Sequence, residues 1–250
     1  MDWSILGAEF LGTFILIIFG VGVNASVSYS KMFANQPGKW IVVAIGWGLG
    51  VFLGVIAANA VGSTNHINPI VTIYATVAGL LPAVQFVPVI LMQLLGAFSA
   101  ALLLDFINWN HIKETDLETV RGSHCTGPAY SNFKEKGLIQ NFSYELVGSL
   151  ALLGMIFALG KSGNSWSNIL GPIPVTLIVT AIGISLGSST GYAINPARDL
   201  GPRLAFLVTE AFVAIKTKKV KIGANWGYAW VPVLAPTIAA VIIGLVARFA

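Results

Sequence analysis

Six long apolar stretches constrain the fold of this chain more than any other feature. The hydrocarbon core of a bilayer is about 30 Å thick and needs about 20 apolar residues per helical crossing, so each stretch is long enough to span a membrane. Only 10% of the residues are charged, against roughly 25% in an average soluble protein. The stretches are 5–23, 40–61, 86–107, 142–160, 169–186 and 228–247. The sequence therefore predicts an all-α membrane protein in which residues 1–250 form one polytopic domain.

The remaining composition excludes several classes of function. The net charge of +4 comes from basic residues in short connecting segments rather than along one amphipathic face, so we expect no nucleic acid partner. The single cysteine, Cys125, cannot form an intrachain disulfide, and no group of Cys and His residues has metal-ligand spacing, so we expect neither a metal nor a cofactor. The first apolar stretch follows Asp2 and no Lys or Arg, and it is too long for the core of a signal peptide. It is therefore predicted to be the first transmembrane helix.

An internal repeat divides the chain into two halves. A polar region at about 108–141 separates three spans in about 1–107 from three spans in about 142–250. The first and fourth spans each contain a glutamate, two apolar residues, a glycine and a hydroxyl residue, beginning at Glu9 and Glu145, and each half later contains Ile-Asn-Pro. Because three crossings reverse the direction of the chain, the second copy is predicted to be inverted relative to the first.

Each Asn-Pro pair is predicted to begin a helix too short to cross the membrane. The apolar segments that follow run over 69–78 in the first half and from 196 to about 208 in the second. Asn68 and Asn195 suit the N-cap, and Pro69 and Pro196 suit the first helical position, where no hydrogen bond is lost. Irregular backbone at membrane depth is tolerated only where it is buried in protein or lines a water-filled cavity. Two half-helices that enter from opposite faces therefore predict such a cavity, with both N-termini near the middle of the membrane.

The half-helices and the segments before them predict a pore for neutral solutes. A helix N-terminus carries about half a positive elementary charge, so two of them at one point oppose cations. The side-chain oxygens of Asn68 and Asn195 can cap their own helices and leave the NH2 groups to donate to a water or alcohol oxygen. Such donation orients the oxygen and interrupts a proton-conducting chain. Backbone carbonyls of the irregular segments supply acceptors, at Thr64, Asn65, His66, Gly191, Tyr192 and Ala193.

Over essentially its whole length the chain resembles the aquaporin superfamily, because of the paired Asn-Pro motifs, the two glutamates and the repeat. The features more similar to the glycerol facilitator branch than to water-only channels are Asp199 directly after Asn195-Pro196-Ala197-Arg198, Arg203, Pro236 and Val120-Arg121-Gly122-Ser123. The resemblance implies six transmembrane helices plus two re-entrant half-helices, and a homotetramer in the lipid bilayer of the cell membrane. It also implies passive passage of glycerol, other small neutral solutes and water, with protons and ions excluded.

The resemblance further implies that Trp47, Gly183, Tyr192 and Arg198 form the narrowest part of the pore. Two aromatic rings can face the carbon chain of a polyol while Arg198 donates to its hydroxyl groups and repels cations. Gly183 leaves width that a side chain would remove. The chain departs from the family pattern at two positions, with Ile70 where Ala is usual and Tyr192 where glycerol facilitators commonly have Phe.

Other interpretations start from the same residues. An intramembrane carboxylate is functional by default, so Glu9 and Glu145 could relay protons in a proton-coupled transporter. The family resemblance implies instead that both glutamates brace the re-entrant loops, and Asp199 is counted with them as structural. His66 either lines the pore or holds its loop. An intramembrane enzyme would need a nucleophile with a base, or a set of metal ligands; we find neither in the sequence and expect no catalysis.

The charged residues conflict with the orientation that the family implies. With both termini in the cytoplasm, the outer segments 24–39, 108–141 and 209–227 hold ten Lys and Arg residues, and the inner segments hold only Lys161 and Arg248. The positive-inside rule favours the reverse orientation. An inverted repeat forms the same pore either way, so the family orientation is kept as the expectation. Asp105, near the end of a span, is expected at the membrane interface.

Overall fold

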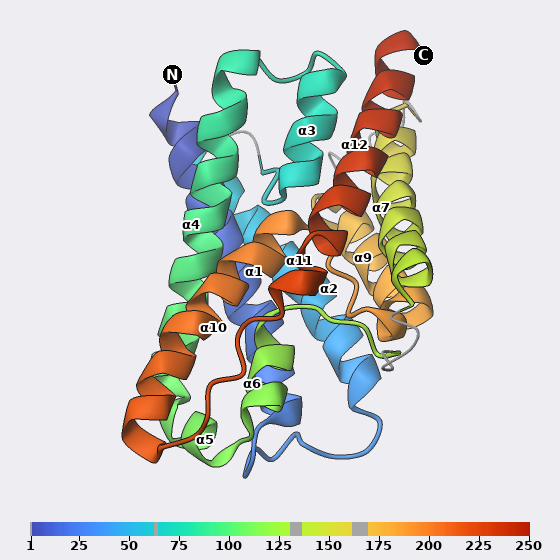
Figure 1. The fold of residues 1–250 in the computed structure, drawn as a ribbon. Helices are drawn as coiled ribbons and strands as arrows, with labels where there is room; N and C mark the ends of the chain where they lie inside the picture. Colours follow the sequence, from blue (N-terminus) through green and yellow to red (C-terminus); the bar gives the residue numbers. More distant parts are fainter. Residues whose placement is uncertain (1, 63–64, 131–136, 162–169) are drawn as a thin grey trace.

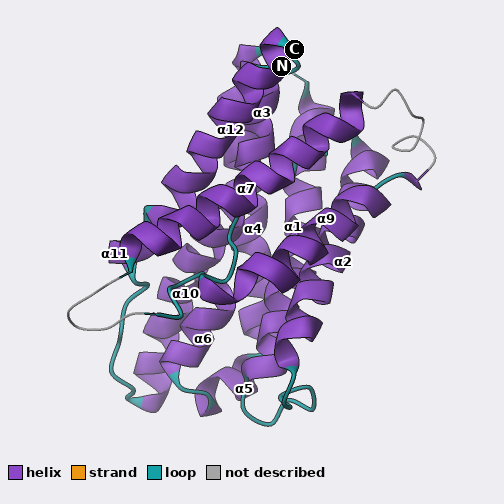
Figure 2. Ribbon diagram, turned by 90° about the vertical axis from the view of Figure 1, so that its right-hand side faces the viewer, coloured by secondary structure: helices purple, strands orange, loops and turns teal. Residues whose placement is uncertain are grey.

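A computed structural model describes residues 2–62, 65–130, 137–161 and 170–250. Within these ranges all regular secondary structure is helical, and the long helices run side by side (Figure 1, Figure 2). The elements are α1 (Trp3–Ser28), α2 (Lys39–Val61), α3 (Pro69–Val77), α4 (Ala83–Ile107), α5 (Trp109–Glu114), α6 (Leu117–His124), α7 (Leu138–Lys161), α9 (Ile173–Leu186), η1 (Gly187–Ser189), α10 (Pro196–Thr217), α11 (Trp226–Ala229) and α12 (Val231–Phe249). Both termini lie towards one end of the molecule, with α3, and α5 and α6 lie towards the other (Figure 1, Figure 2).

Five candidate membrane spans occur in the described part of the chain. They are α1, α2, α4, α7 and the continuous segment Trp226–Phe249, which joins α11 to α12. The predicted span 169–186 corresponds to α9, which begins at Ile173 and forms with η1 a shorter apolar helix over Ile173–Ser189. By length and composition the chain is a multi-pass, all-α membrane protein.

The first predicted half-helix is present as α3. Asn68 lies at its N-cap, where the side-chain oxygen accepts a hydrogen bond from the Ile70 N–H at 3.1 Å, and Pro69 is its first residue. The helix is 9 residues long and ends at Val77, one residue before the predicted end. An N-cap asparagine followed by proline thus marks the start of this helix correctly.

The second predicted half-helix is longer than the sequence suggested. It begins at Pro196 as expected, but α10 continues for 22 residues to Thr217, so the predicted end near 208 was wrong. Two polar residues that looked like the start of a loop are buried and have partners. The Thr209 hydroxyl donates to Asp105 at 2.6 Å, and the Glu210 carboxylate accepts from the Gly223 N–H at 2.8 Å. Because these contacts satisfy the polar groups, the helix continues.

Asp105, which was expected at the membrane interface, is buried within the protein. It is only 5% exposed, and its carboxylate accepts hydrogen bonds from His124 and Thr209. The region that supplies His124 is not an open loop, because α5 and α6 lie within it. Ile112, Leu117 and Val120 from these helices form an apolar cluster with residues of α1 and α10. This end of the bundle is therefore capped by packed helices.

Glycines allow the central helices to approach closely. A Cβ atom built on Gly54 of α2 would lie 2.7 Å from the Gly12 carbonyl oxygen of α1. A Cβ on Gly96 of α4 would lie 2.4 Å from the Phe10 carbonyl oxygen, also on α1. Both distances are shorter than van der Waals contact, so α1 packs directly against the backbones of its two neighbours. Small residues at such positions are typical of membrane helices.

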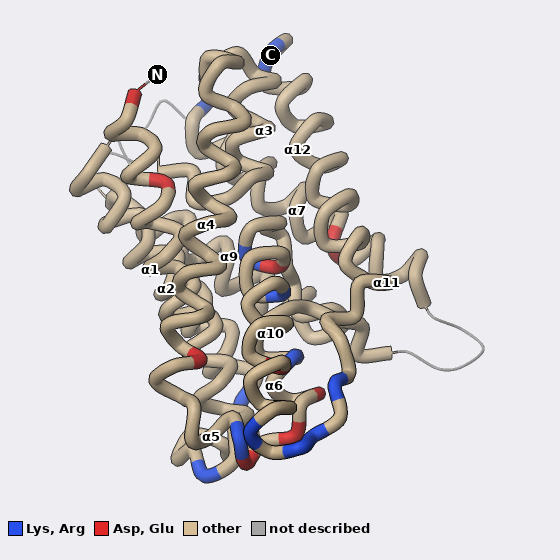
Figure 3. The backbone as a smooth tube through the Cα atoms, turned by 60° about the vertical axis from the view of Figure 1, so that its left-hand side comes forward, with Lys and Arg blue, Asp and Glu red and all other residues tan. Residues whose placement is uncertain are grey.

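The two Asn-capped helices lie between the halves of the chain. α3 packs against α12 and α10 packs against α4, so each contacts a long helix from the opposite half. Figure 1 shows the N-terminal ends of α3 and α10 meeting in the middle of the molecule. Figure 3 shows that most Lys and Arg residues in the described ranges gather around α5, α6 and the end of α10, away from the termini.

We predict that Gly96→Ala lowers the free energy of unfolding, by about 1–3 kcal/mol as for other overpacked sites, because the new methyl group would meet the Phe10 carbonyl oxygen. The matched control is Gly154→Ala on α7, where an added Cβ meets no atom within 4 Å. The control should be neutral or slightly stabilising, since alanine favours helix more than glycine. Thermal unfolding in one detergent compares the two. Equal stability of Gly96→Ala and the parent would contradict this packing.

Candidate functional site

Two loops of unusual backbone conformation precede α3 and α10. Asn65 and Ile67 have φ angles of 35° and 46°, and Tyr192 and Ile194 have φ angles of 35° and 39°. This left-handed region is unfavourable for residues with a Cβ, and it is rarest for β-branched residues such as isoleucine. Each such residue costs of order 1–3 kcal/mol. Surrounding contacts must therefore hold both loops.

Glu9 on α1 holds the first loop. Its Oε1 accepts from the backbone N–H of His66 at 2.7 Å, and its Oε2 accepts from the N–H of Ile67 at 2.7 Å. Gln93 of α4 donates to the same Oε2 at 2.7 Å. The carboxylate is fully buried, so these bonds replace the water that it would otherwise need.

Glu145 on α7 makes the equivalent contacts with the second loop. Its Oε1 accepts from the Ala193 N–H at 2.9 Å and from the Thr190 hydroxyl at 2.8 Å, and its Oε2 accepts from the Ile194 N–H at 3.0 Å. This side chain is also fully buried. In both halves, a carboxylate thus binds the two consecutive N–H groups that precede the helix-capping asparagine.

The two asparagines connect the loops to each other. The Oδ1 atom of Asn195 caps α10 by accepting from the Ala197 N–H at 3.0 Å, as Asn68 caps α3. The Nδ2 of Asn68 donates to the carbonyl oxygen of Ile194 at 2.9 Å, and the Nδ2 of Asn195 donates to the carbonyl oxygen of Ile67 at 2.9 Å. The sequence analysis did not predict these two hydrogen bonds between the loops. Because an amide NH2 carries two N–H groups, one remains on each asparagine for a solute.

A cavity of about 400 Å³ lies at this junction. Its polar lining residues are Asn59, Asn65, His66, Asn68 and Asn195. Apolar residues of α1, α2, α7 and α9 also line it, among them Leu16, Val51, Val55, Leu152, Ile156, Val175 and Val179. A cavity lined by both polar and apolar residues suits a small molecule that has hydroxyl groups along a carbon chain.

A second cavity, of about 530 Å³, includes Trp47 and Arg198 in its lining. The guanidinium carbon of Arg198 lies 3.8 Å from the centroid of the Trp47 ring, a close cation–π contact. Arg198 donates from Nη1 to the carbonyl oxygen of His124 at 3.2 Å, and Trp47 donates from Nε1 to Asn24 at 3.1 Å. Asn195 caps the helix in whose first turn Arg198 lies. One helical turn therefore separates the asparagine junction from the arginine.

Gly183 and Tyr192 lie beside each other, but neither lines these two cavities. A Cβ on Gly183 would lie 2.8 Å from both Cζ and Oη of Tyr192, so the tyrosine ring fills the space that the glycine leaves. The ring is 5% exposed, and its hydroxyl has no hydrogen-bond partner among the described residues. It contacts Trp40 edge-on, with ring centroids 6.0 Å apart. Trp40 lines the 530 Å³ cavity; the sequence analysis missed it because it stands at the start of a span.

Asp199 and Arg203 form a fully buried ion pair on the first turns of α10, with Nε and Oδ1 2.8 Å apart. Asp199 also accepts from the backbone N–H and the hydroxyl of Thr126, at 2.8 and 2.6 Å. Arg203 donates to the carbonyl oxygens of Thr126 and Ala224. The pair therefore attaches the segment after α6 and the segment before α11 to the helix that carries Arg198.

The other predicted site residues take varied positions. His66 contacts the Thr72 hydroxyl through Nδ1 at 3.1 Å and lines the 400 Å³ cavity, so it both holds its loop and faces the cavity. Gly191 lines the 530 Å³ cavity. Ile70 is fully buried in the apolar core. Thr64 lies outside the described residues.

Comparison with known proteins identifies the family. The family described as Major intrinsic protein matches residues 2–247. The chain belongs to this family. The match confirms the resemblance to the aquaporin superfamily that the motifs indicated.

Three proteins similar to this chain have names that refer to glycerol uptake or to an aquaglyceroporin. A protein of Mycoplasmoides gallisepticum, "Probable glycerol uptake facilitator protein", is 42% identical over 252 residues, covering 96% of this chain and 95% of that protein. The "Glycerol uptake facilitator protein" of Bacillus subtilis is 40% identical over 231 residues, covering 92% of this chain and 78% of that one. The X-ray structure of the aquaglyceroporin from Plasmodium falciparum has a TM-score of 0.77 at 28% identity, covering 97% of this chain and 93% of that chain. The family and its fold thus extend over the whole described molecule.

We predict that Glu145→Gln lowers the free energy of unfolding by about 1–3 kcal/mol, the usual cost of an unsatisfied buried group. Glutamine keeps one acceptor oxygen and places an NH2 group against the other loop N–H. Glu118→Gln is the control, because it makes the same chemical change on the exposed side of α6, where about 0.5 kcal/mol or less is expected. Thermal unfolding in detergent measures both. If Glu145→Gln is as stable as Glu118→Gln, the carboxylate does not hold the loop.

Proposed function

We propose that the protein is a passive channel for glycerol and other small neutral solutes, with water as a further permeant, that excludes protons and ions. The asparagine junction carries this proposal. Each asparagine there donates one N–H to the opposite loop and keeps one for a solute, beside a cavity lined by both polar and apolar residues. A polyol has hydroxyl groups that can accept from these N–H groups and a carbon chain that can contact the apolar residues. The names of the relatives, glycerol uptake facilitators, support this substrate class.

Trp47 and Arg198 are proposed to form the constriction. Among the described residues, the Arg198 guanidinium has one hydrogen-bond partner, the His124 carbonyl, which leaves four of its five N–H groups for solute hydroxyls. The Trp47 ring offers an apolar surface to the carbon chain. The fixed charge of Arg198 and the positive ends of α3 and α10 both oppose cations. Gly183 is proposed to act through Tyr192, by giving its ring a place beside α9.

We also propose the architecture that the family implies, with six spans and two re-entrant helices in an inverted repeat. The spans would be α1, α2, α4, α7, α9 and α12, and the re-entrant helices α3 and α10. Residues 1–250 would form one domain, with halves 1–107 and 142–250 joined by 108–141. Glu9 and Glu145 make equivalent hydrogen bonds in the two halves, and so do Asn68 and Asn195. These equivalent contacts support the repeat.

A homotetramer in the cell membrane, with both termini cytoplasmic, completes the proposal by family resemblance. Exposed apolar side chains on α2 and α7, such as Ile41, Leu49, Val147 and Met155, provide surface for lipid or for neighbouring subunits. The basic residues around α5 and α6 oppose this orientation under the positive-inside rule. The same pore forms in either orientation.

The proton-coupled alternative has no support. It would use Glu9 and Glu145 as proton carriers, but both oxygens of each carboxylate already accept hydrogen bonds from the loops. Protonation would release a loop whose backbone conformation depends on these bonds. We therefore assign both glutamates a bracing role and propose that the protein makes and breaks no covalent bond.

We predict that purified protein in liposomes passes glycerol only down its own gradient, at a rate proportional to that gradient, and that an imposed pH gradient does not drive glycerol uphill. The physical reason is that no described group on the proposed path must change its protonation to let a neutral solute pass. Stopped-flow light scattering with a pH dye inside the vesicles measures both quantities, and protein-free liposomes are the control. Uphill glycerol movement driven by the pH gradient, or a permeability equal to that of protein-free liposomes, would contradict the proposal.

A further inference from the structure

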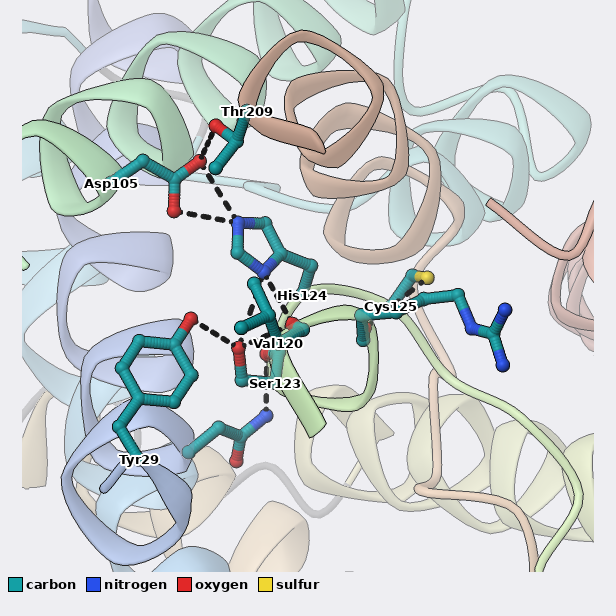
Figure 4. A network of polar contacts seen from close by, with 9 residues as sticks. Tyr29, Asp105, Val120, Ser123, His124, Cys125 and Thr209 are labelled. Atoms are coloured by element: carbon teal, nitrogen blue, oxygen red, sulfur yellow. Dashed lines mark hydrogen bonds and ion pairs between the residues drawn. The ribbon is translucent and has the colours of Figure 1, made fainter. Parts of the chain in front are cut away.

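His124, the last residue of α6, is fully buried between charged and polar partners (Figure 4). Its Nε2 atom lies 2.8 and 3.0 Å from the two carboxylate oxygens of Asp105 on α4. Its Nδ1 atom lies 2.7 Å from the carbonyl oxygen of Val120. A carbonyl oxygen can only accept, so Nδ1 must carry a proton, and Nε2 donates to the carboxylate. Both ring nitrogens therefore face oxygen acceptors, an arrangement that fits an imidazolium.

The surroundings favour this charged form. The Thr209 hydroxyl donates to Asp105 at 2.6 Å, so the acceptor of His124 is itself held in place. An imidazolium at the end of α6 also interacts favourably with the negative end of the helix dipole. Burial lowers the pKa of His124, and the positive charge of Arg198 lowers it further. The charge and hydrogen bond of Asp105 and the hydrogen bond to the Val120 carbonyl outweigh these effects, so the pKa of His124 is raised.

The backbone at the end of α6 holds both sides of the constriction. The His124 carbonyl accepts from Arg198 Nη1 at 3.2 Å. The neighbouring Ser123 carbonyl accepts from Asn24 Nδ2 at 3.0 Å, and the Oδ1 atom of Asn24 accepts from the Trp47 indole at 3.1 Å. The His124 ring fixes these two carbonyls in place through Asp105 on α4 and an edge contact with Phe206 on α10, with ring centroids 5.8 Å apart.

This pair adjoins a cavity that is separate from the proposed path. Asp105 and Thr209 line a third cavity, of about 540 Å³, formed by residues of α4, α5 and α10. This cavity shares no lining residue with the cavities at Asn68 and Arg198. The charged or titratable groups around the ring are Asp105 from α4, Arg198 from α10 and, through Ser123, Tyr29 after α1.

We propose that His124 is a positioning residue for the Arg198–Trp47 constriction, and that it acts as an imidazolium anchored by Asp105, so that the selectivity of the channel depends on pH. This inference rests on the proposed function. Below its raised pKa, the ring donates at both nitrogens and the constriction is held. As the pH rises through that pKa, one donor is lost, two acceptors face each other across 2.7 Å, and the end of α6 loosens. Larger polyols should then pass more readily.

The test is the ratio of glycerol permeability to xylitol permeability, measured in liposomes by stopped-flow light scattering between pH 5 and pH 9. In the parent we expect this permeability ratio to fall about fivefold as the pH rises. The loss of one buried hydrogen bond changes an equilibrium constant by about this factor. The transition should lie above about pH 6.5, the ordinary pKa of histidine. Asp105→Asn should move the transition to lower pH, and His124→Gln should abolish it.

His111→Asn is the matched control. His111 is a histidine of the same connecting region whose ring bonds the Ser30 carbonyl rather than Asp105 or Val120, so the variant should keep the parental transition. A parent ratio that does not change with pH, or a transition that persists in His124→Gln, would overturn the inference. Glycerol conduction by the parent at pH 6 tests the proposed function separately.

A second measurement needs no folded variant of the network. In the 15N NMR spectrum of histidine-labelled parent in bilayers at pH 6, His124 should show two protonated ring nitrogens, with the His111→Asn spectrum aiding assignment. A neutral His124 ring at that pH would also overturn the inference.

Discussion

Each asparagine at the centre of the molecule donates one amide N–H to the backbone carbonyl of the opposite loop, and the pore depends on these two bonds. The acceptors are Ile67 and Ile194, and the N–H groups of these two isoleucines are bound by Glu9 and Glu145. A change in the backbone of either loop would therefore alter the hydrogen bonds of both loops. At membrane depth there is little water to replace a lost partner, so such a closed set of hydrogen bonds is strongly maintained.

The same arrangement explains how a neutral solute can pass where an ion cannot. The loops are held by buried carboxylates whose oxygens are all engaged, so their negative charge is directed at the backbone rather than at the path. The proposed path passes the positive ends of α3 and α10 and the guanidinium of Arg198. A hydroxyl oxygen can accept from these groups, whereas their positive charge repels a cation. In the proposed channel, selectivity thus follows from which polar atoms of each loop are left without a protein partner.

The sequence predicted the local features of the site better than its long-range contacts. Asn68-Pro69 marked the start of α3, and Pro196 marked the start of α10, because N-cap and first-turn preferences are local. The end of α10 was misjudged, because Thr209 and Glu210 are stabilised by Asp105 and by the 222–223 backbone, which no local pattern indicates. The contact of Gly183 with the Tyr192 ring also depends on tertiary packing.

The pairing of His124 with Asp105 was missed for the same reason. Asp105, near the end of an apolar span, was expected at the membrane interface; a carboxylate buried in protein needs hydrogen-bond donors or a cationic partner. A search for that partner among the few histidines and arginines outside the spans would have been a useful signal. It would not have indicated the proposed role of the same histidine in positioning the constriction, because that link runs through backbone carbonyls.

The central claim is that each asparagine shares its NH2 group between the opposite loop and the solute. An experimental structure in lipid with glycerol present, at a resolution that locates solute oxygens, tests it most directly. The account predicts a glycerol or water oxygen about 3 Å from Nδ2 of both Asn68 and Asn195, a normal hydrogen-bond distance, while each nitrogen still contacts the opposite isoleucine carbonyl. Solute oxygens that pass without contacting either amide, or an asparagine turned away from the opposite loop, would contradict it.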